Sequence, residues 1–292
     1  MIVSHQQNTR SGAKHCGKVY LAAAGPGDPD LITVKAADAL RSADVVLTDR
    51  LVSEEILHRY VPAMADIVYV GKECRKKVST PQQTINTLIA KYALQGKTVV
   101  RLKGGDVSVF SNILDELEVL AAHNIPYEII PGVTAALGAA AYSGIPLTAR
   151  GYSTAVRFLT YYKSDVVTED YWQELAKTSD TLVFYMSAAT IATVVEKLQQ
   201  YGISNNVQLA VAEQATTCFQ KIHTCNIYEF NQKFAHAEFI SPSLVIIGRV
   251  VALHEQFNWF ANEDAGTNQY FAPVAKRKND FYKLTNAIKN VV

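Results

Sequence analysis

The chain has 292 residues, of which 49% are hydrophobic and 19% are charged, and its formal net charge is +1. This length predicts about two domains with sizeable cores. The balanced charge excludes the strong basic field typical of general nucleic-acid or acidic-membrane binders. The four cysteines form no CxxC pair, and the seven histidines lack metal-ligand spacing. We therefore expect reduced thiols, no metal, no nucleic-acid partner and a cytoplasmic protein.

The two ends of the chain differ from its middle. Residues 1–17 lack hydrophobic periodicity and are too polar for a signal peptide, so we expect a disordered N-terminal tail. Residues 262–292 are also polar and are expected to form a C-terminal tail. The most apolar stretch, residues 132–147, is too short to span a bilayer and predicts a buried helix. No contact with a membrane is expected.

The first half of the chain alternates between strand and helix patterns. Short apolar runs predict strands over residues 18–24, 44–49, 66–71, 97–106 and 127–132. Helical patterns lie between them over residues 30–43, 81–96 and 112–124. In the first of these helices, the spacing predicts a buried face made of Leu31, Val34, Ala37 and Leu40. This alternation favours a mainly parallel sheet that is covered on both faces.

The second half of the chain is richer in strands. Strands are predicted over residues 155–162, 180–186, 207–214, 220–227 and 242–253, with one helix over 187–202. Because strands outnumber helices, a mixed sheet is expected here. Glycine and proline around residues 144–153 indicate a linker. We therefore predict an N-terminal α/β domain over residues 18–148 and a C-terminal α/β domain over 149–261.

Three glycine-rich turns follow predicted strands of the first half. They are "AAGPGDPD" (23–30), "LKGGD" (102–106) and "IPGVTAA" (130–136). None matches the dinucleotide or Walker A pattern, and each alone is explained by a tight connection from strand to helix. Together, they would gather at one edge of a parallel sheet, where α/β proteins bind ligands.

A series of ordered motifs resembles the tetrapyrrole methylase family. The opening "VYLAAAGPGDPDLITVKAADAL" (19–40) is followed by "VGK" (70–72), "VVRLKGGD" (99–106), "PGVTAALGAAAYSGIPLT" (131–148), "VAEQATT" (211–217) and "SPSLVIIGRVV" (241–251). Within the family, these motifs are most similar to those of the uroporphyrinogen-III C-methyltransferases. The resemblance covers roughly residues 18–260.

The resemblance implies two α/β domains with a cleft between them, and usually a homodimer. It implies that S-adenosylmethionine lies in the cleft and methylates carbons of uroporphyrinogen III. The products would be S-adenosylhomocysteine and precorrin-2, a precursor of sirohaem and cobalamin. Carried over by motif, the cofactor contacts are Pro26, Gly104, Gly105, Asp106, Val109, Thr134, Ala135, Met186 and Ala215.

Three of these cofactor assignments have a chemical rationale. The Gly-Pro-Gly turn would let backbone approach the cofactor where a Cβ would collide. Asp106 would pair with the cofactor's ammonium group. Met186 would offer a soft apolar contact, although core packing would be the simpler explanation for this methionine on its own.

The family assigns proton handling to an aspartate in a "DR" motif and a lysine in a "GK" motif. These residues are Asp49 and Lys72 in this chain. Asp49 is the expected base, and Lys72 the expected acid or electrostatic partner. Considered alone, Asp49 would more simply pair with Arg50, and Lys72 would be a surface residue after a strand.

The chain departs from the family where an anionic tetrapyrrole would be met. The usual Phe-Gly-Arg-Gly-Gly-Glu-Glu is "FSNILDE" (110–116), Pro-Leu-Thr-His-Arg is "PLTAR" (146–150), and Thr-Gly-His is "TYY" (160–162). We expect the substrate carboxylates to be bound instead by other cations of the chain, which are Arg50, Arg75, Lys76, Lys77 and Arg150. The alternatives are a methylase of a different tetrapyrrole, another superfamily methylase such as a precorrin or diphthamide enzyme, and a cofactor-binding paralogue or sensor without turnover.

Overall fold

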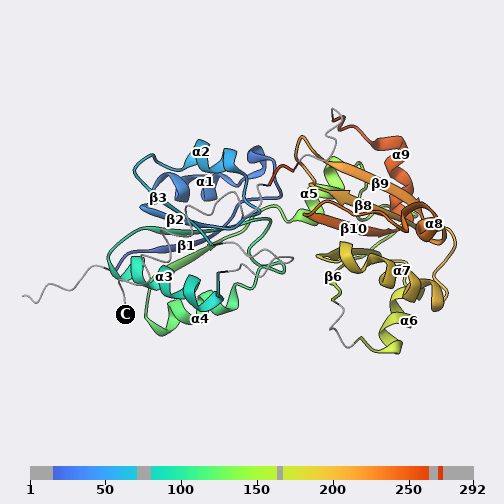
Figure 1. Ribbon diagram of the computed structural model, residues 1–292, viewed down its shortest axis with the longest axis horizontal. Coiled ribbons are helices and arrows are strands. Elements are labelled where there is room, and N and C mark those ends of the chain that lie inside the picture. The colour runs from blue at the N-terminus through green and yellow to red at the C-terminus, as the bar shows by residue number, and fades with distance from the viewer. Residues whose placement is uncertain (1–15, 71–79, 163–166, 263–268, 272–292) are drawn as a thin grey trace, which may run out of the picture.

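A computed structural model describes residues 16–70, 80–162, 167–262 and 269–271. Lys72 and the cations at positions 75–77 lie outside the described residues, as does nearly all of the predicted N-terminal tail. The chain forms two five-stranded sheets, each with helices on both faces, set side by side (Figure 1). The two predicted α/β units are therefore confirmed.

The first sheet is parallel throughout, with the strand order β3-β2-β4-β1-β5. Its strands are β1 (Val19–Ala23), β2 (Val45–Thr48), β3 (Asp66–Tyr69), β4 (Val99–Lys103) and β5 (Tyr127–Ile130). Helices α1 (Val34–Arg41) and α2 (Glu54–Tyr60) cover one face, and α3 (Gln82–Leu94) and α4 (Leu114–Ala122) cover the other (Figure 1). A short 3-10 helix, η1 (Pro29–Leu31), precedes α1.

Alternating side chains of the strands fill the two halves of this core. Leu21 packs in the cluster beneath α3 and α4, and its neighbour Ala22 packs in the cluster beneath α1 and α2. The predicted buried face of the first helix is wrong in part, because Val34 is 78% exposed. Thr33 caps α1 by accepting a hydrogen bond from Ala36 N, so Val34 occupies the exposed first turn.

The second sheet is mixed, as predicted, with the strand order β6-β7-β10-β8-β9. Its strands are β6 (Val156–Thr160), β7 (Thr181–Tyr185), β8 (Gln208–Glu213), β9 (Lys221–Asn226) and β10 (Ser243–Gly248). Strands β6 and β7 pair in parallel, whereas the other pairs are antiparallel. Around the sheet lie α6 (Glu169–Lys177), η2 (Ala188–Thr190), α7 (Ile191–Gln200), η3 (Ile227–Glu229), α8 (Phe230–Phe234), η4 (Arg249–Leu253) and α9 (His254–Phe257).

Two features of the second half differ from the sequence prediction. The apolar run at 242–253 is a strand only as far as Gly248, after which the backbone turns into η4. Both parts are buried, so composition alone did not separate them. Helix α6 was not predicted, although Thr168 caps it and Trp172 anchors it in the core.

Helix α5 (Ala135–Tyr142) packs against the second sheet (Figure 1). Its buried alanines, including Ala136 and Ala139, share a cluster with Val183 of β7 and Ile246 of β10. The sequence-based boundary at residue 148 would place this helix in the first domain. We propose that the boundary lies between β5 and α5.

In the part of the chain that the structure describes, no helix combines the length and apolarity that a membrane crossing needs.

Candidate functional site

The three glycine-rich turns meet at the carboxyl edge of the first sheet, as predicted. Gly25 and Gly105 pair through their backbones, with N···O distances of 3.1 and 2.7 Å. The third turn joins them because Gly132 N donates to Asp106 Oδ2 at 2.9 Å. A Cβ built on Gly105 would meet only Ala135 N, at 3.8 Å. The backbone of Gly105 is therefore uncrowded on the side where a Cβ would lie, next to Ala135, another predicted cofactor residue.

Asp106 connects the second and third turns. Its Oδ1 accepts a hydrogen bond from Ser108 N at 2.7 Å, while Oδ2 accepts from Gly132 N. The residue is only 9% exposed. These bonds give Asp106 a structural role that the sequence analysis did not foresee. A carboxylate has further lone pairs, so pairing with the cofactor's ammonium group stays a prediction.

The Gly-Pro-Gly turn contacts the second unit. A Cβ added at Gly138 of α5 would lie 2.6 Å from Pro26 Cγ, and one at Gly27 would lie 2.8 Å from Thr217 Cγ2. Glycine at these positions thus allows the two units to approach closely. The sequence analysis attributed the glycines of the turn to the cofactor alone, whereas their nearest neighbours include protein atoms of the facing unit.

Asp28, directly after this turn, bonds to the second unit twice. Its backbone N–H donates to Thr216 Oγ1 at 3.1 Å, and its Oδ2 accepts from the Tyr142 hydroxyl at 2.5 Å. Burial and the bond to Asp28 raise the pKa of Tyr142 to about 12. The tyrosine therefore remains a neutral donor across the ordinary pH range, and it fixes the turn against α5.

Tyr185, the last residue of β7, organises the second unit's side of the site. Its hydroxyl shares a 2.7 Å hydrogen bond with Thr134 Oγ1 and accepts another from Ala136 N at 3.1 Å. Its ring lies 5.0 Å from that of Phe110 in the first unit. Burial raises the pKa of Tyr185. Its position next to Met186 at a strand end was the signal that could have identified this residue.

Met186 is 49% exposed and has a left-handed φ of 54°. The alternative that it packs in the core is therefore wrong. Its Sδ accepts a hydrogen bond from the Tyr162 hydroxyl at 3.0 Å. Tyr162 stands in one of the segments that depart from the family, so this departure directly contacts a predicted cofactor residue.

The remaining predicted cofactor residues lie around the junction. Val109 packs on the core of the second unit, and the Ala215 carbonyl lies 3.2 Å from a Cβ built on Gly27. Gly104 approaches the segment after β2, because its Cβ would lie 2.8 Å from Leu51 O. These contacts link the cofactor turns to the segment that begins with Asp49.

Asp49 follows β2 and is held by a buried arginine. Arg101 Nη2 donates to Asp49 Oδ1 at 2.6 Å, and Nη1 donates to the carbonyls of Leu47 and Leu102 at 3.3 and 3.1 Å. The side chain of Asp49 is 27% exposed, whereas that of Arg101 is 3% exposed. One carboxylate oxygen is therefore fixed, while the side chain as a whole stays partly exposed. The partner expected from the sequence was Arg50, which is half-buried.

Arg101 belongs to a buried ion network with Lys103 and Glu116. Arg101 Nε donates to Glu116 Oε1 at 2.9 Å, and Lys103 Nζ donates to both Glu116 oxygens at 3.1 Å. Burial opposes the charge on Arg101, but the carboxylates of Asp49 and Glu116 outweigh it and raise its pKa. Burial, followed by repulsion from Arg101, lowers the pKa of Lys103.

The sequence analysis missed this network. Its signal was two cations at alternate positions of an otherwise apolar strand, "VVRLK" (99–103), because such cations share one face and need buried partners.

The altered segment at residues 110–116 leads into α4. Its left-handed residues are Phe110 (φ 51°) and Asn112 (φ 55°), which are not the positions where the family has glycine. Asn112 Nδ2 donates to Asp115 Oδ2 at 2.7 Å. The segment thus closes on itself and offers no cation. Arg150, a predicted substitute, is exposed.

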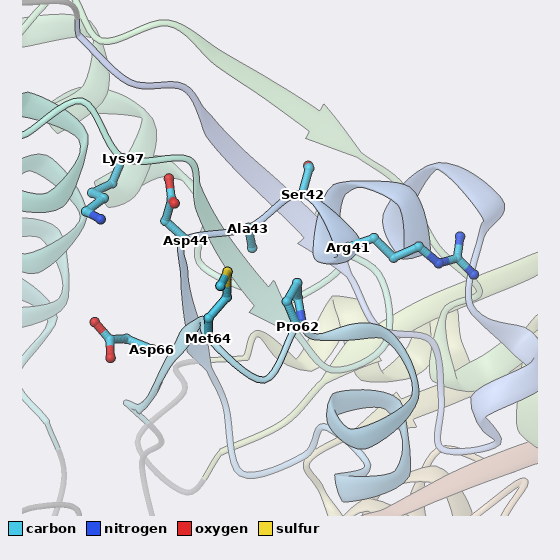
Figure 2. A pocket seen from close by; sticks show the side chains of 8 residues that line it. All are labelled: Arg41, Ser42, Ala43, Asp44, Pro62, Met64, Asp66 and Lys97. Carbon is cyan, nitrogen blue, oxygen red and sulfur yellow. The ribbon is translucent and has the colours of Figure 1, made fainter.

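A hollow of 380 Å³ lies at the opposite edge of the first sheet (Figure 2). Asp44 and Lys97 precede strands β2 and β4, and Asp66 begins β3. Asp44 Oδ2 accepts a hydrogen bond from Thr98 N at 2.7 Å, so this carboxylate already caps a strand. The hollow is separate from the turns at the carboxyl edge.

In the described ranges, no group of three or more histidine, cysteine, aspartate or glutamate side chains could hold a metal ion.

Comparison with known proteins relates this arrangement to a family. The family model of "Tetrapyrrole (Corrin/Porphyrin) Methylases" matches residues 18–231. A siroheme synthase of Saccharophagus degradans is 45% identical over 244 residues, which are 84% of this chain and 53% of that protein. The chain therefore spans about half the length of the curated relatives it matches.

Solved structures share the whole fold. A cobalt precorrin-4 methyltransferase matches with a TM-score of 0.71 and 26% identity, covering 80% of this chain and 95% of that one. A uroporphyrin-III C-methyl transferase of Thermus thermophilus, complexed with S-adenyl homocysteine, matches with a TM-score of 0.67 and 33% identity, covering 80% and 93%. The chain belongs to the tetrapyrrole (corrin/porphyrin) methylase family.

Proposed function

We propose that this protein is an S-adenosylmethionine-dependent C-methyltransferase that converts uroporphyrinogen III to precorrin-2, on the route to sirohaem and cobalamin. The observation that carries the proposal is the placement of Asp49. Its carboxylate is fixed by the buried Arg101 at the same sheet edge where the three glycine-rich turns meet. The resemblance to a uroporphyrin-III C-methyl transferase with bound S-adenyl homocysteine supports both the cofactor and the substrate.

The cofactor site would be formed by the turns of the first unit and the facing residues of the second. Gly105 lies next to Ala135, Gly104 packs closely against Leu51, and Asp106 holds their turn in shape. Met186, which is half-exposed and whose sulfur is bonded to the Tyr162 hydroxyl, would contribute from the second unit. S-adenosylmethionine supplies the methyl group on a sulfonium that is already a strong electrophile, so alignment is the protein's main task.

Asp49 would act as the base. The attacking pyrrole carbon forms a bond to the methyl group while the carbon–sulfur bond breaks and S-adenosylhomocysteine leaves. A proton must then depart from the macrocycle, and the Asp49 carboxylate would accept it. Arg101 would act as a positioning residue, since its 2.6 Å bond fixes the carboxylate. We propose Lys72, from the motif resemblance, as the acid or electrostatic partner.

Substrate recognition would rely on Arg50 and Arg150, because the family's arginine segment is absent. Arg50 follows Asp49 directly, and Arg150 is exposed just beyond α5. One observation favours a second candidate, methylation of a different tetrapyrrole: Asn112 stands where the family has arginine and is bonded to Asp115. The replacement of this arginine by Asn112 removes a cation from the substrate side, whereas the cofactor turns keep their motifs.

We further propose a cytoplasmic homodimer, as the family resemblance implies. Its test is sedimentation of the purified protein, in which a monomer at micromolar concentration would contradict this part of the proposal.

The experiment compares Asp49→Ala with Asp38→Ala, a control that removes an exposed carboxylate of α1 paired with Arg41. Turnover of uroporphyrinogen III and S-adenosylhomocysteine affinity are both measured. Loss of a general base costs roughly 10²- to 10⁴-fold in rate. We expect that loss for Asp49→Ala with retained cofactor affinity, and wild-type behaviour for the control. Equal turnover in both variants would exclude Asp49 as the base, and a cofactor-binding wild type without turnover would indicate a sensor.

A further inference from the structure

Residues 214–217 form the loop after β8 that carries Ala215. Two of its residues have left-handed backbones: Gln214 with a φ of 46° and Thr216 with a φ of 67°. Neither is glycine, so this conformation is unfavourable unless the surroundings hold it. Gln214 is 1% exposed and Thr216 is 3% exposed. The contacts that hold this loop therefore decide where Ala215 lies.

Two sets of contacts come from the folded units themselves. Gln214 N donates to Pro242 O at 2.8 Å, and Thr216 N donates to Gln220 Oε1 at 2.8 Å. The first unit reaches the loop through Asp28, whose N–H donates to Thr216 Oγ1. These bonds fix the backbone of Gln214 and both the backbone and the hydroxyl of Thr216. The Gln214 side chain also donates from Nε2 to Phe219 O at 3.4 Å.

The third set comes from residues 269–271, within the region predicted to be a polar tail. Tyr270 N donates to Gln214 Oε1 at 2.7 Å, and the Tyr270 and Ser53 hydroxyls share a hydrogen bond of 2.8 Å. The Tyr270 ring packs edge-on against Phe219 at 6.4 Å and against Phe271 at 5.1 Å. Phe271 is only 3% exposed. This short segment is therefore packed into the fold.

Tyr270 thus joins the two units at the cofactor side. Ser53 caps α2 in the first unit and lies four residues after Asp49, while Gln214 belongs to the second unit and precedes Ala215. A single residue bonds to both, through its side chain on one side and its backbone on the other. The donor to Gln214 is the backbone N–H of Tyr270, so the Tyr270 side chain acts by holding that N–H in place, through its bond to Ser53 and its packing on Phe219. Loss of the side chain would weaken the bond to the buried amide of Gln214 and allow the loop to relax.

We propose that Tyr270, anchored by the buried Phe271, is a positioning residue that holds the loop at 214–217 in the conformation that binds the cofactor. The inference rests on the proposed function, because Ala215 is assigned to the cofactor there. It adds a part of the chain beyond Asn262 to the machinery of cofactor binding. The contribution acts on cofactor affinity, since neither Tyr270 nor Phe271 contacts Asp49.

The test uses the full-length protein and three variants: Tyr270→Ala, Tyr270→Phe and, as a matched control, Tyr228→Phe. Tyr228 donates its hydroxyl to Ile203 O at 2.6 Å within the second unit, so its variant loses the same kind of bond elsewhere. The dissociation constant for S-adenosylhomocysteine is measured by calorimetry. Amide hydrogen exchange is followed at residues 213–217, and kcat is measured at saturating S-adenosylmethionine.

We expect Tyr270→Ala to raise the dissociation constant about tenfold, and Tyr270→Phe to raise it about twofold, because the latter loses one hydrogen bond. Exchange at residues 213–217 should accelerate in the same order, with kcat unchanged and Tyr228→Phe like the wild type. Unchanged affinity and exchange in Tyr270→Ala would overturn the inference. If that variant fails to fold, unchanged values in Tyr270→Phe overturn it. A wild type that binds no S-adenosylhomocysteine would instead refute the proposed function, and the inference with it.

Discussion

Replacing Glu116 with glutamine perturbs the network behind Asp49 while keeping the size of the side chain. The Glu116 carboxylate accepts from Arg101 Nε at 2.9 Å and from Lys103 Nζ at 3.1 Å, and the residue is 1% exposed. In the wild type, two buried cations face two carboxylates. Glu116→Gln leaves Arg101 and Lys103 with the single charge of Asp49.

The expected cost is large because the remaining charges cannot reach water. Removing one partner of a buried ion pair costs about 3–5 kcal/mol. A folded protein of this kind has a free energy of unfolding of about 5–15 kcal/mol. We therefore expect Glu116→Gln to lower the free energy of unfolding by about 3 kcal/mol or more at neutral pH. We also expect lower turnover, because Arg101 loses the charged partner at Nε that orients it towards Asp49.

The pH dependence of this loss has a definite sign. Burial lowers the pKa of Lys103 in the folded protein below its ordinary value of 10.5, and Glu116 opposes that shift. Between the lowered pKa and 10.5, the unfolded chain binds more protons than the folded one, so stability rises with pH. Without Glu116 the pKa of Lys103 falls further and this window widens. The deficit of Glu116→Gln relative to the wild type should therefore shrink as pH rises towards 10.5.

The assay is urea unfolding of wild type, Glu116→Gln and Glu118→Gln at about pH 7 and about pH 10. Glu118 lies on the same helix and is exposed, so its variant should stay within about 0.5 kcal/mol of the wild type. If Glu116→Gln is as stable as Glu118→Gln, Glu116 does not act as a buried charged partner of Arg101 and Lys103. An equally large deficit at both pH values would refute the assignment of the low pKa to Lys103.

Two further predictions concern the junction of the units and the response to acid. Gly138→Ala places a Cβ 2.6 Å from Pro26 Cγ, so it should destabilise the protein by about 1–3 kcal/mol and weaken S-adenosylhomocysteine binding. Unchanged thermal unfolding and unchanged affinity would show that the Gly-Pro-Gly turn does not need this close approach. The hydrogen bond from Lys18 lowers the pKa of Glu128 to about 2, so the stabilising contribution of this carboxylate is present above its ordinary pKa of 4.5 and lost as pH falls towards 2. The urea midpoints of Glu128→Gln and wild type should converge over that range, and a constant difference would refute the pairing.

The order of the elements could be predicted from the sequence because burial on both faces leaves a clear pattern. Parallel strands such as β2 are buried throughout and consist mainly of apolar residues, and glycine-rich turns follow three strands of the first sheet. The partner sheet of α5 could not be predicted in this way. Its alanines are apolar on all sides, so their pattern does not indicate which sheet they pack against.

The candidate site was predicted where motif residues end parallel strands of one sheet. The turns that carry Gly25, Gly105 and Gly132 lie together as expected. The contacts of Tyr185 and Tyr270 could not be predicted, because their partners are distant in the sequence. Tyr185 bonds to Thr134, and Tyr270 bonds to Ser53 of the first unit. Such long-range contacts depend on how the two units fit together, which no local pattern encodes.

The measurement that tests the central claim most directly is anaerobic incubation of the wild-type protein with S-adenosylmethionine and enzymatically generated uroporphyrinogen III. The macrocycle is then analysed by mass spectrometry, and cofactor binding is confirmed separately. The account predicts a dimethylated macrocycle and stoichiometric S-adenosylhomocysteine. An unmodified macrocycle from a protein that binds the cofactor would contradict it, and would direct attention to Asn112 and Tyr162, where this chain departs from its family.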